Sequence, residues 1–205
     1  MTETLEEFLR RLGDATPTPG GGSAAALCGA IGAALARMVA NLALGKEGYE
    51  PVQGDVRDLV LRAQALEQRL VQLITADADA YENVSLAYKM PKTSDAERAK
   101  RKEAIQLALH QATLVPLETM ERSVDALDIA LQALRKGSRS AFTDAGAAGI
   151  LAHAALRAAW LNVAVNLSSV QDAGFRDEVE RKAKALQERG GGVAGEVERE
   201  VQARL

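Results

Sequence analysis

The chain has 205 residues, of which 47% are hydrophobic, and this is enough apolar material for one domain with a buried core. Its formal charge of −3 gives no reason to expect a nucleic acid or an anionic membrane as a partner. The single cysteine, Cys28, excludes an internal disulfide and is typical of a protein of the reducing cytoplasm.

Three helices are predicted in the first half of the chain. A short amphipathic helix over 4–12 begins with a capping box. An alanine-rich apolar helix is expected over 23–44, with Ser23 as its N-cap and Gly45 just past its end. A long helix with an apolar stripe at helical spacing follows over 52–88.

The second half predicts two or three more helices. A capping box opens a long helix over 94–137, and either Thr143 or Asp144 is expected to cap the small-residue helix that runs from there to about residue 168. The charged tail over 175–205 also has helical periodicity. Three consecutive glycines over 190–192 predict a break in it.

No stretch alternates with the period of a strand, so the predicted fold class is all-α, a bundle of five or six helices that includes long ones. We expect a single domain over 1–205, since no linker or internal repeat interrupts the pattern. Aromatic residues make up 3% of the chain, and a core of alanine and aliphatic residues brings helix axes close together. Such alanine-lined faces favour a homodimer.

The apolar segment 23–44 is long enough to cross a bilayer, so a membrane helix is an alternative. Arg37 and Asn41 interrupt the segment, and its bulk is alanine and glycine rather than leucine. A helix that is apolar all round is equally suited to the centre of a soluble bundle. No secretory leader is visible in the acidic residues 1–12, and we expect a cytoplasmic protein without a membrane partner.

The glycine-rich turn before the central helix is the first candidate binding element. Pro17 and Pro19 make an extended approach to Gly20, Gly21 and Gly22. Bare amides at the positive end of a helix can receive an anionic or carbonyl-bearing ligand. The alternative is a tight loop that allows a buried helix to begin in a crowded place. The turn is neither a phosphate P-loop nor a dinucleotide fingerprint.

Asp77 is the strongest catalytic candidate. It lies four residues from Leu73 and Tyr81, so the helical period places a carboxylate on the apolar face. Burial raises the pKa of a carboxyl group, and a carboxyl that holds and releases a proton near neutral pH suits general acid/base chemistry. The alternative is a buried acid paired with an arginine or lysine from another helix.

Several other polar residues are candidates for a cleft, each with a structural alternative. Lone lysines past helix ends are usually solvated, an aspartate at a helix start is often a cap, and core asparagines often bond across a bundle. His110 and His153 do not converge with acids at metal-ligand spacing, so no metal is expected. The candidates for ligand contact are Lys46, Lys92, Asp144, Asn162 and Asn166.

An ordered set of short motifs resembles the formiminotetrahydrofolate cyclodeaminase / methenyltetrahydrofolate cyclohydrolase family. The set spans roughly residues 5–172, and its members follow the family's order. The matching pieces are Pro17–Ser23, Met38–Leu42 with Gly45-Lys46 and Gly48-Tyr49, Asp77–Tyr81, Ala87–Lys92, Val115-Pro116, Thr143-Asp144 and Asn162–Leu167.

The resemblance implies an all-helical homodimer with folate-binding clefts near the subunit interface. It implies that Asp77 is the active-site acid, with Lys46 and Asp144 contributing to the cleft. The resulting set of expected substrate-binding residues is Gly20, Gly21, Gly22, Ser23, Lys46, Tyr81, Lys92, Asp144 and Asn162. The implied substrate is a tetrahydrofolate derivative, with no metal and no cofactor.

Two related reactions are open, together with a non-catalytic alternative. The first is the cyclisation of 5-formimidoyltetrahydrofolate to 5,10-methenyltetrahydrofolate with release of ammonia. The second is hydrolysis of the methenyl bridge by a cyclohydrolase. Both require proton transfer at the same atoms, which a single carboxyl can provide. The third possibility is a helical folate-binding or scaffold protein without turnover.

Overall fold

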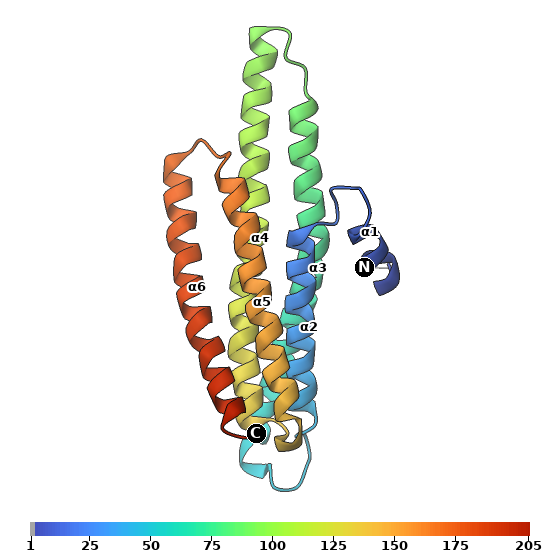
Figure 1. Ribbon diagram of the computed structural model, residues 1–205, viewed down its shortest axis with the longest axis vertical. Coiled ribbons are helices and arrows are strands. Elements are labelled where there is room, and N and C mark those ends of the chain that lie inside the picture. The colour runs from blue at the N-terminus through green and yellow to red at the C-terminus, as the bar shows by residue number, and fades with distance from the viewer. Residues whose placement is uncertain (1–2) are drawn as a thin grey trace.

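The computed structural model describes residues 3–205, and within that range the chain folds into helices without a strand (Figure 1). Six α-helices and two short 3₁₀ turns follow one another. They are α1 (Leu5–Leu12), α2 (Gly21–Asn41), η1 (Glu50–Val52), α3 (Gln53–Lys89), α4 (Asp95–Lys136), η2 (Arg139–Ala141), α5 (Phe142–Leu167) and α6 (Ala173–Gln202). The all-α prediction is confirmed.

The helices α3 and α4 form a long hairpin whose tip extends beyond the rest of the bundle (Figure 1). Helix α4 packs against α2, α3, α5 and α6, so it is the central support of the molecule. Helix α2 begins about midway along the bundle and runs antiparallel to α3, while α5 lies beside α2 (Figure 1). This arrangement brings the first turn of α2 against the middle of α3.

Small residues allow α2 and α5 to approach closely. A Cβ atom on Gly32 would lie 2.9 Å from the carbonyl oxygen of Ala148, and one on Gly29 would lie 3.5 Å from the Cβ of Ala155. Alanine supplies the best helix propensity, and its short side chain permits this contact. The first turn of α2 is therefore held by a closely packed helix pair rather than by a loop.

Four local predictions were wrong. The central helix was predicted to end just before Gly45, but α2 ends at Asn41. Ser23 is not the N-cap of α2: the helix begins at Gly21 with Gly20 as its cap, and the Ser23 side chain instead bonds to α3. Neither Thr143 nor Asp144 caps α5, because both lie inside its first turn. Helix α6 continues through residues 190–192 without a break. The close approach of Leu156 requires a small residue at Gly190, whereas a Cβ on Gly191 or Gly192 would meet nothing within 4 Å.

Within the described residues 3–205, two helices have the length and composition of a membrane span. They cover Gly21–Asn41 and, together with η2, Arg139–Leu167. These two helices pack against each other and against α4, and their most buried residues are alanines and glycines that meet other helices. Such packing is what a buried core helix of a bundle requires.

Candidate active site

The first turn of α2 meets α3 at Asp77. A Cβ atom on Gly22 would lie 2.0 Å from Oδ1 of Asp77 and 2.5 Å from its Cγ. No real Cβ makes such a contact, so only glycine leaves space for the carboxyl group at this position. The glycine-rich turn and the candidate acid, 55 positions apart in the chain, therefore form one site.

Ser23 holds the carboxyl group from the neighbouring position. Its Oγ lies 3.0 Å from Oδ2 of Asp77 and 3.0 Å from the carbonyl oxygen of Ile74. The serine is fully buried, whereas Asp77 is half-buried. The hydroxyl therefore fixes the inner oxygen of the carboxyl, and the carboxyl keeps one part open to a ligand.

Burial raises the pKa of the Asp77 carboxyl above its usual value, because the charged form is poorly solvated there. Hydrogen bonds from the side chain and the backbone amide of Ser23 lower the pKa in part. Within residues 3–205, no arginine or lysine pairs with Asp77. Within the described residues, Asp77 is therefore not a buried acid paired with a cation.

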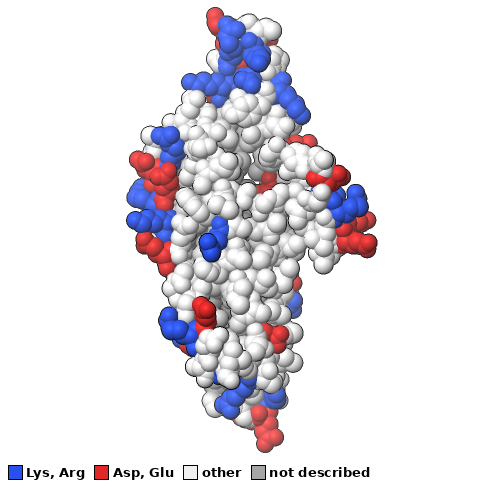
Figure 2. Space-filling view, in the orientation of Figure 1, with Lys and Arg blue, Asp and Glu red and all other residues white. Residues whose placement is uncertain are grey.

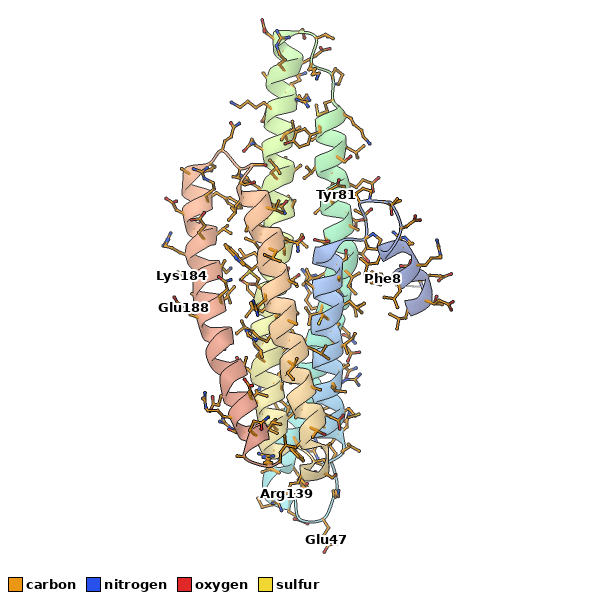
Figure 3. All side chains as sticks on the ribbon, viewed as in Figure 1. Phe8, Glu47, Tyr81, Arg139, Lys184 and Glu188 are labelled. Carbon is orange, nitrogen blue, oxygen red and sulfur yellow. The ribbon has the colours of Figure 1, made fainter. Side chains whose placement is uncertain are left out.

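Asn162 and Tyr81 are the other predicted site residues near this turn. The side-chain amide of Asn162 lies beside Gly21: a Cβ atom on Gly21 would be 3.5 Å from its Nδ2. The same Nδ2 donates a hydrogen bond to the carbonyl oxygen of Ala158 at 3.0 Å. Tyr81 lies one helical turn beyond Asp77 on α3 and is exposed, near the start of α2 (Figure 3). Gly20 caps the same turn. Asn162 and Gly20 therefore lie at the turn that meets Asp77, and Tyr81 lies one helical turn along α3 from it.

Lys46 and Asp144 lie at the opposite end of the bundle within one chain. Nζ of Lys46 lies 5.9 Å from the ring centroid of Tyr49, and the hydroxyl of Tyr49 accepts a hydrogen bond from the backbone amide of Arg139. Asp144 follows Arg139 in the first turn of α5. Figure 3 places Arg139 at the end of the molecule far from the start of α2. The 21 residues of α2 span about 30 Å. A single chain therefore does not bring these two residues to Asp77.

Lys92 is exposed in the connection between α3 and α4, at the tip of the long hairpin. Its neighbours there are also basic, and Figure 2 shows this end of the molecule covered by positive side chains. The basic residues of the tip are Lys89, Lys92, Arg98, Lys100, Arg101 and Lys102. The structure leaves Lys92 well beyond the turn that holds Asp77.

The remaining polar candidates are bonded within the bundle. Asn166 donates to the carbonyl oxygen of Ala112 on α4 at 2.6 Å. The ring of His110 stacks on Phe175 with centroids 4.1 Å apart. Among residues 3–205, no three histidine, cysteine or acidic side chains are grouped to hold a metal ion.

A mostly apolar cavity does not coincide with the carboxyl site. It has a volume of about 510 Å³, lies between α5 and α6, and is mostly apolar, with His153 in its wall. Asp77 lines neither this cavity nor the next three. His153 and Glu198 both line the α5–α6 cavity, but within residues 3–205 no hydrogen bond or ion pair joins them.

The arrangement at Asp77 is suited to moving one proton at a time. A carboxyl whose pKa is raised by burial keeps its proton to a higher pH than an exposed one, and the helix start beside it presents amides to an electronegative atom. Sequence reasoning identified Asp77 but missed the contact with Ser23. Only a tertiary contact between residues far apart in the chain reveals that bond.

Comparison with known proteins places these observations in a family context. A family model described as formiminotransferase-cyclodeaminase matches residues 4–185. A methenyltetrahydrofolate cyclohydrolase of Methylorubrum extorquens is 41% identical over 90% of this chain and 88% of the relative. A formimidoyltransferase-cyclodeaminase of Rattus norvegicus is 34% identical over 91% of this chain. This chain spans about a third of the rat protein, 34% of its length.

The fold also matches a solved structure. A crystal structure of formiminotetrahydrofolate cyclodeaminase from Thermotoga maritima superposes with a TM-score of 0.89 and is 28% identical in sequence. The match covers 98% of this chain and 97% of that one. The similarity therefore extends over the whole bundle, including the tail helix α6 that the family model covers only in part.

Proposed function

The chain belongs to the formiminotransferase-cyclodeaminase family, and from this premise we propose that Asp77 is the general acid/base of a site that acts on the N5–N10 bridge of tetrahydrofolate. The protein is a folate one-carbon enzyme. The observation that carries the role of Asp77 is its position: it is half-buried, held by Ser23, and placed against Gly22 at the start of a helix.

The first proposed reaction is the cyclisation of 5-formimidoyltetrahydrofolate. N10 of the folate attacks the formimidoyl carbon, the N5–N10 bridge closes, and ammonia departs. The formimidoyl nitrogen enters the reaction protonated, as the amidinium cation. Asp77 takes the proton from N10 and delivers it to that nitrogen, which leaves as ammonia, so the carboxyl has the same protonation state after one turnover. The Thermotoga maritima cyclodeaminase, which matches over its full length, supports this reaction.

Hydrolysis of 5,10-methenyltetrahydrofolate is a second candidate, and the 41% identity to the Methylorubrum extorquens cyclohydrolase favours it. Here Asp77 takes a proton from the attacking water and returns it to the nitrogen that leaves when the ring opens, while the second proton of the water is released to solvent as the hydroxyl becomes the formyl oxygen. Neither reaction as proposed needs a metal or an organic cofactor. The two reactions share every protein group, so geometry alone does not separate them.

Supplying each substrate to the purified protein separates the two reactions. Cyclisation produces the methenyl chromophore together with an equal amount of ammonia. Hydrolysis consumes the chromophore and releases no ammonia. Absence of turnover with both substrates would instead support a non-catalytic folate-binding or scaffold protein and would contradict the proposed role of Asp77.

We also propose that the enzyme is a cytoplasmic homodimer. Large apolar side chains are exposed along the neighbouring outer faces of α2 and α5, and Figure 2 shows that face largely without charge. The exposed residues are Ile31, Met38, Leu42, Ile150, Leu161 and Val165. An antiparallel pair joined there sets the Lys46 and Asp144 end of one chain beside Asp77 of the other. Light scattering should give a mass near twice 21.7 kDa.

A further inference from the structure

The hydroxyl of Ser23 has one hydrogen and two acceptors within reach. Its Oγ lies 3.0 Å from Oδ2 of Asp77 and 3.0 Å from the carbonyl oxygen of Ile74. Because a hydroxyl donates once and accepts through its lone pairs, it cannot donate to both at the same time. The direction of the bond between Ser23 and Asp77 must therefore depend on whether the carboxyl is ionised.

We propose that Ser23 is a positioning residue whose hydroxyl reverses its hydrogen bonds each time Asp77 gains or loses a proton. When Asp77 is ionised, Ser23 donates to the carboxylate. When Asp77 is neutral, the carboxylic acid donates to Oγ and Ser23 turns its own hydrogen to the carbonyl of Ile74. No proton leaves the serine; the proton that moves passes between Asp77 and the substrate nitrogen.

This inference rests on the proposed function, because that reaction requires one carboxyl both to take and to give a proton. A fixed donor would favour the anion and would weaken Asp77 as an acid, whereas a fixed acceptor would favour the neutral form and would weaken it as a base. A hydroxyl with two alternative bonds holds the carboxyl in one position and stabilises both protonation states.

The surroundings of Ser23 make its hydroxyl the group that responds. The side chain is fully buried, so solvent does not replace it. Burial and Ser23 account for the pKa shift of Asp77, with no contribution from a charged side chain of the described chain. On α2 the carboxyl adjoins Gly22, and on α5 the amide of Asn162 adjoins Gly21; neither residue is charged.

Two titratable groups on α3 are exposed to solvent, and one on α4 is stacked on another ring. On α3 itself, Asp79 and Tyr81 are exposed. On α4, the ring of His110 stacks on the ring of Phe175 of α6.

The hydroxyl of Ser23 is not needed to satisfy the backbone around it. The carbonyl of Ile74 lies inside α3, where the helix itself provides an amide donor four residues on. Loss of the hydroxyl therefore leaves that carbonyl satisfied. Ser123 offers a matched comparison: it is equally buried, and its Oγ donates to the carbonyl of Thr119 at 2.7 Å, within α4 and without a carboxyl partner.

The test is a carbon-13 NMR titration of the aspartate side-chain carboxyls in the full chain. The Asp77 signal is identified by its loss in Asp77→Asn. In Ser23→Ala we expect the midpoint of this signal to move to higher pH, because a hydroxyl bonds more strongly to the charged carboxylate than to the neutral acid, so the ionised form loses more stabilisation. In Ser123→Ala the midpoint should stay at the wild-type pH. Ser23→Cys keeps a side chain of similar shape with a weak donor and should move the midpoint in the same direction as Ser23→Ala.

Turnover gives the second reading of the same variants. Ser23→Ala should lower kcat about tenfold and leave KM within about twofold, since the bond acts on the proton step rather than on substrate binding. An unmoved midpoint in Ser23→Ala would overturn the inference, and so would an equal movement in Ser123→Ala. If the midpoint moves but the protein turns over neither substrate, the role of Ser23 toward Asp77 is supported and the proposed function is contradicted.

Discussion

Gly22 is the position at which a single methyl group should disable the site. In Gly22→Ala the new Cβ would lie 2.0 Å from Oδ1 of Asp77, whereas an ordinary contact begins at 3.4 Å. The carboxyl must move by more than 1 Å, and a displacement of that size commonly lowers a rate by about 100-fold. We therefore expect kcat to fall by about 100-fold or more.

The cost in stability should be much smaller than the cost in activity. Loss of the Ser23 bond to a charged group destabilises by about 1.5–3 kcal/mol, while alanine in place of glycine in a helix returns about 0.5–1 kcal/mol. The net change in the free energy of unfolding is about 1–2 kcal/mol, measured by urea denaturation. Turnover is followed through methenyl-folate absorbance and ammonia release.

Gly54 provides the control for this prediction. It is the second residue of α3, as Gly22 is the second residue of α2, and a Cβ there would meet nothing within 4 Å. Gly54→Ala should keep wild-type turnover and should not lower stability. If Gly22→Ala retained kcat within about threefold of wild type, the close contact with Asp77 would have no catalytic meaning and the reasoning would be refuted.

Three further predictions concern stability and reactivity. Because folding raises the pKa of Asp77, the folded state binds more protons than the unfolded state between the two pKa values, so stability falls as pH rises through that window. Asp77→Asn should gain stability over wild type on going from acidic to neutral pH in urea titrations; a constant difference would contradict this. Gly190→Ala should lower the free energy of unfolding by about 1–3 kcal/mol, since its Cβ would lie 2.3 Å from Leu156. Gly192→Ala should be neutral or stabilising, because a Cβ there meets nothing within 4 Å. Equal effects of the two substitutions would contradict the close contact at Gly190. Cys28 should react more slowly with iodoacetamide at neutral pH than a free thiol, because burial raises its pKa; an equal rate would be inconsistent with this.

The fold followed closely from local patterns. Capping boxes at Thr4 and Ser94 were confirmed, because their bonds join residues three apart and depend on the neighbouring sequence alone. The helical period also placed Asp77 on the inner face of α3. These features belong to single helices, and hydrophobic periodicity reports the buried face of a helix directly.

The misjudged positions depended on contacts between helices. Ser23 is a residue type that caps helices, but its hydroxyl bonds to α3 residues more than 50 positions away. Glycines at 190–192 would weaken an isolated helix, yet Gly190 is required where Leu156 and Leu127 approach. Local propensity carries no information about such neighbours, so tertiary packing overrides it.

Local sequence patterns also could not predict which site residues lie close together within one chain. Motif order placed Gly22, Asp77, Lys46 and Asp144 in one functional set. In one chain, only the first two are in contact. The proposed antiparallel dimer would resolve this separation, since residues at opposite ends of one bundle lie side by side in such a pair.

Turnover by Asp77→Asn is the most direct test of the account. Asparagine keeps the shape of the side chain but neither takes nor gives a proton near neutral pH, and general acid/base catalysis typically contributes about 10²–10⁴-fold. We predict that kcat for either substrate falls by at least about 100-fold while the helical content and the mass in solution stay unchanged. A folded Asp77→Asn protein with near wild-type kcat would show that this carboxyl does not carry the reaction.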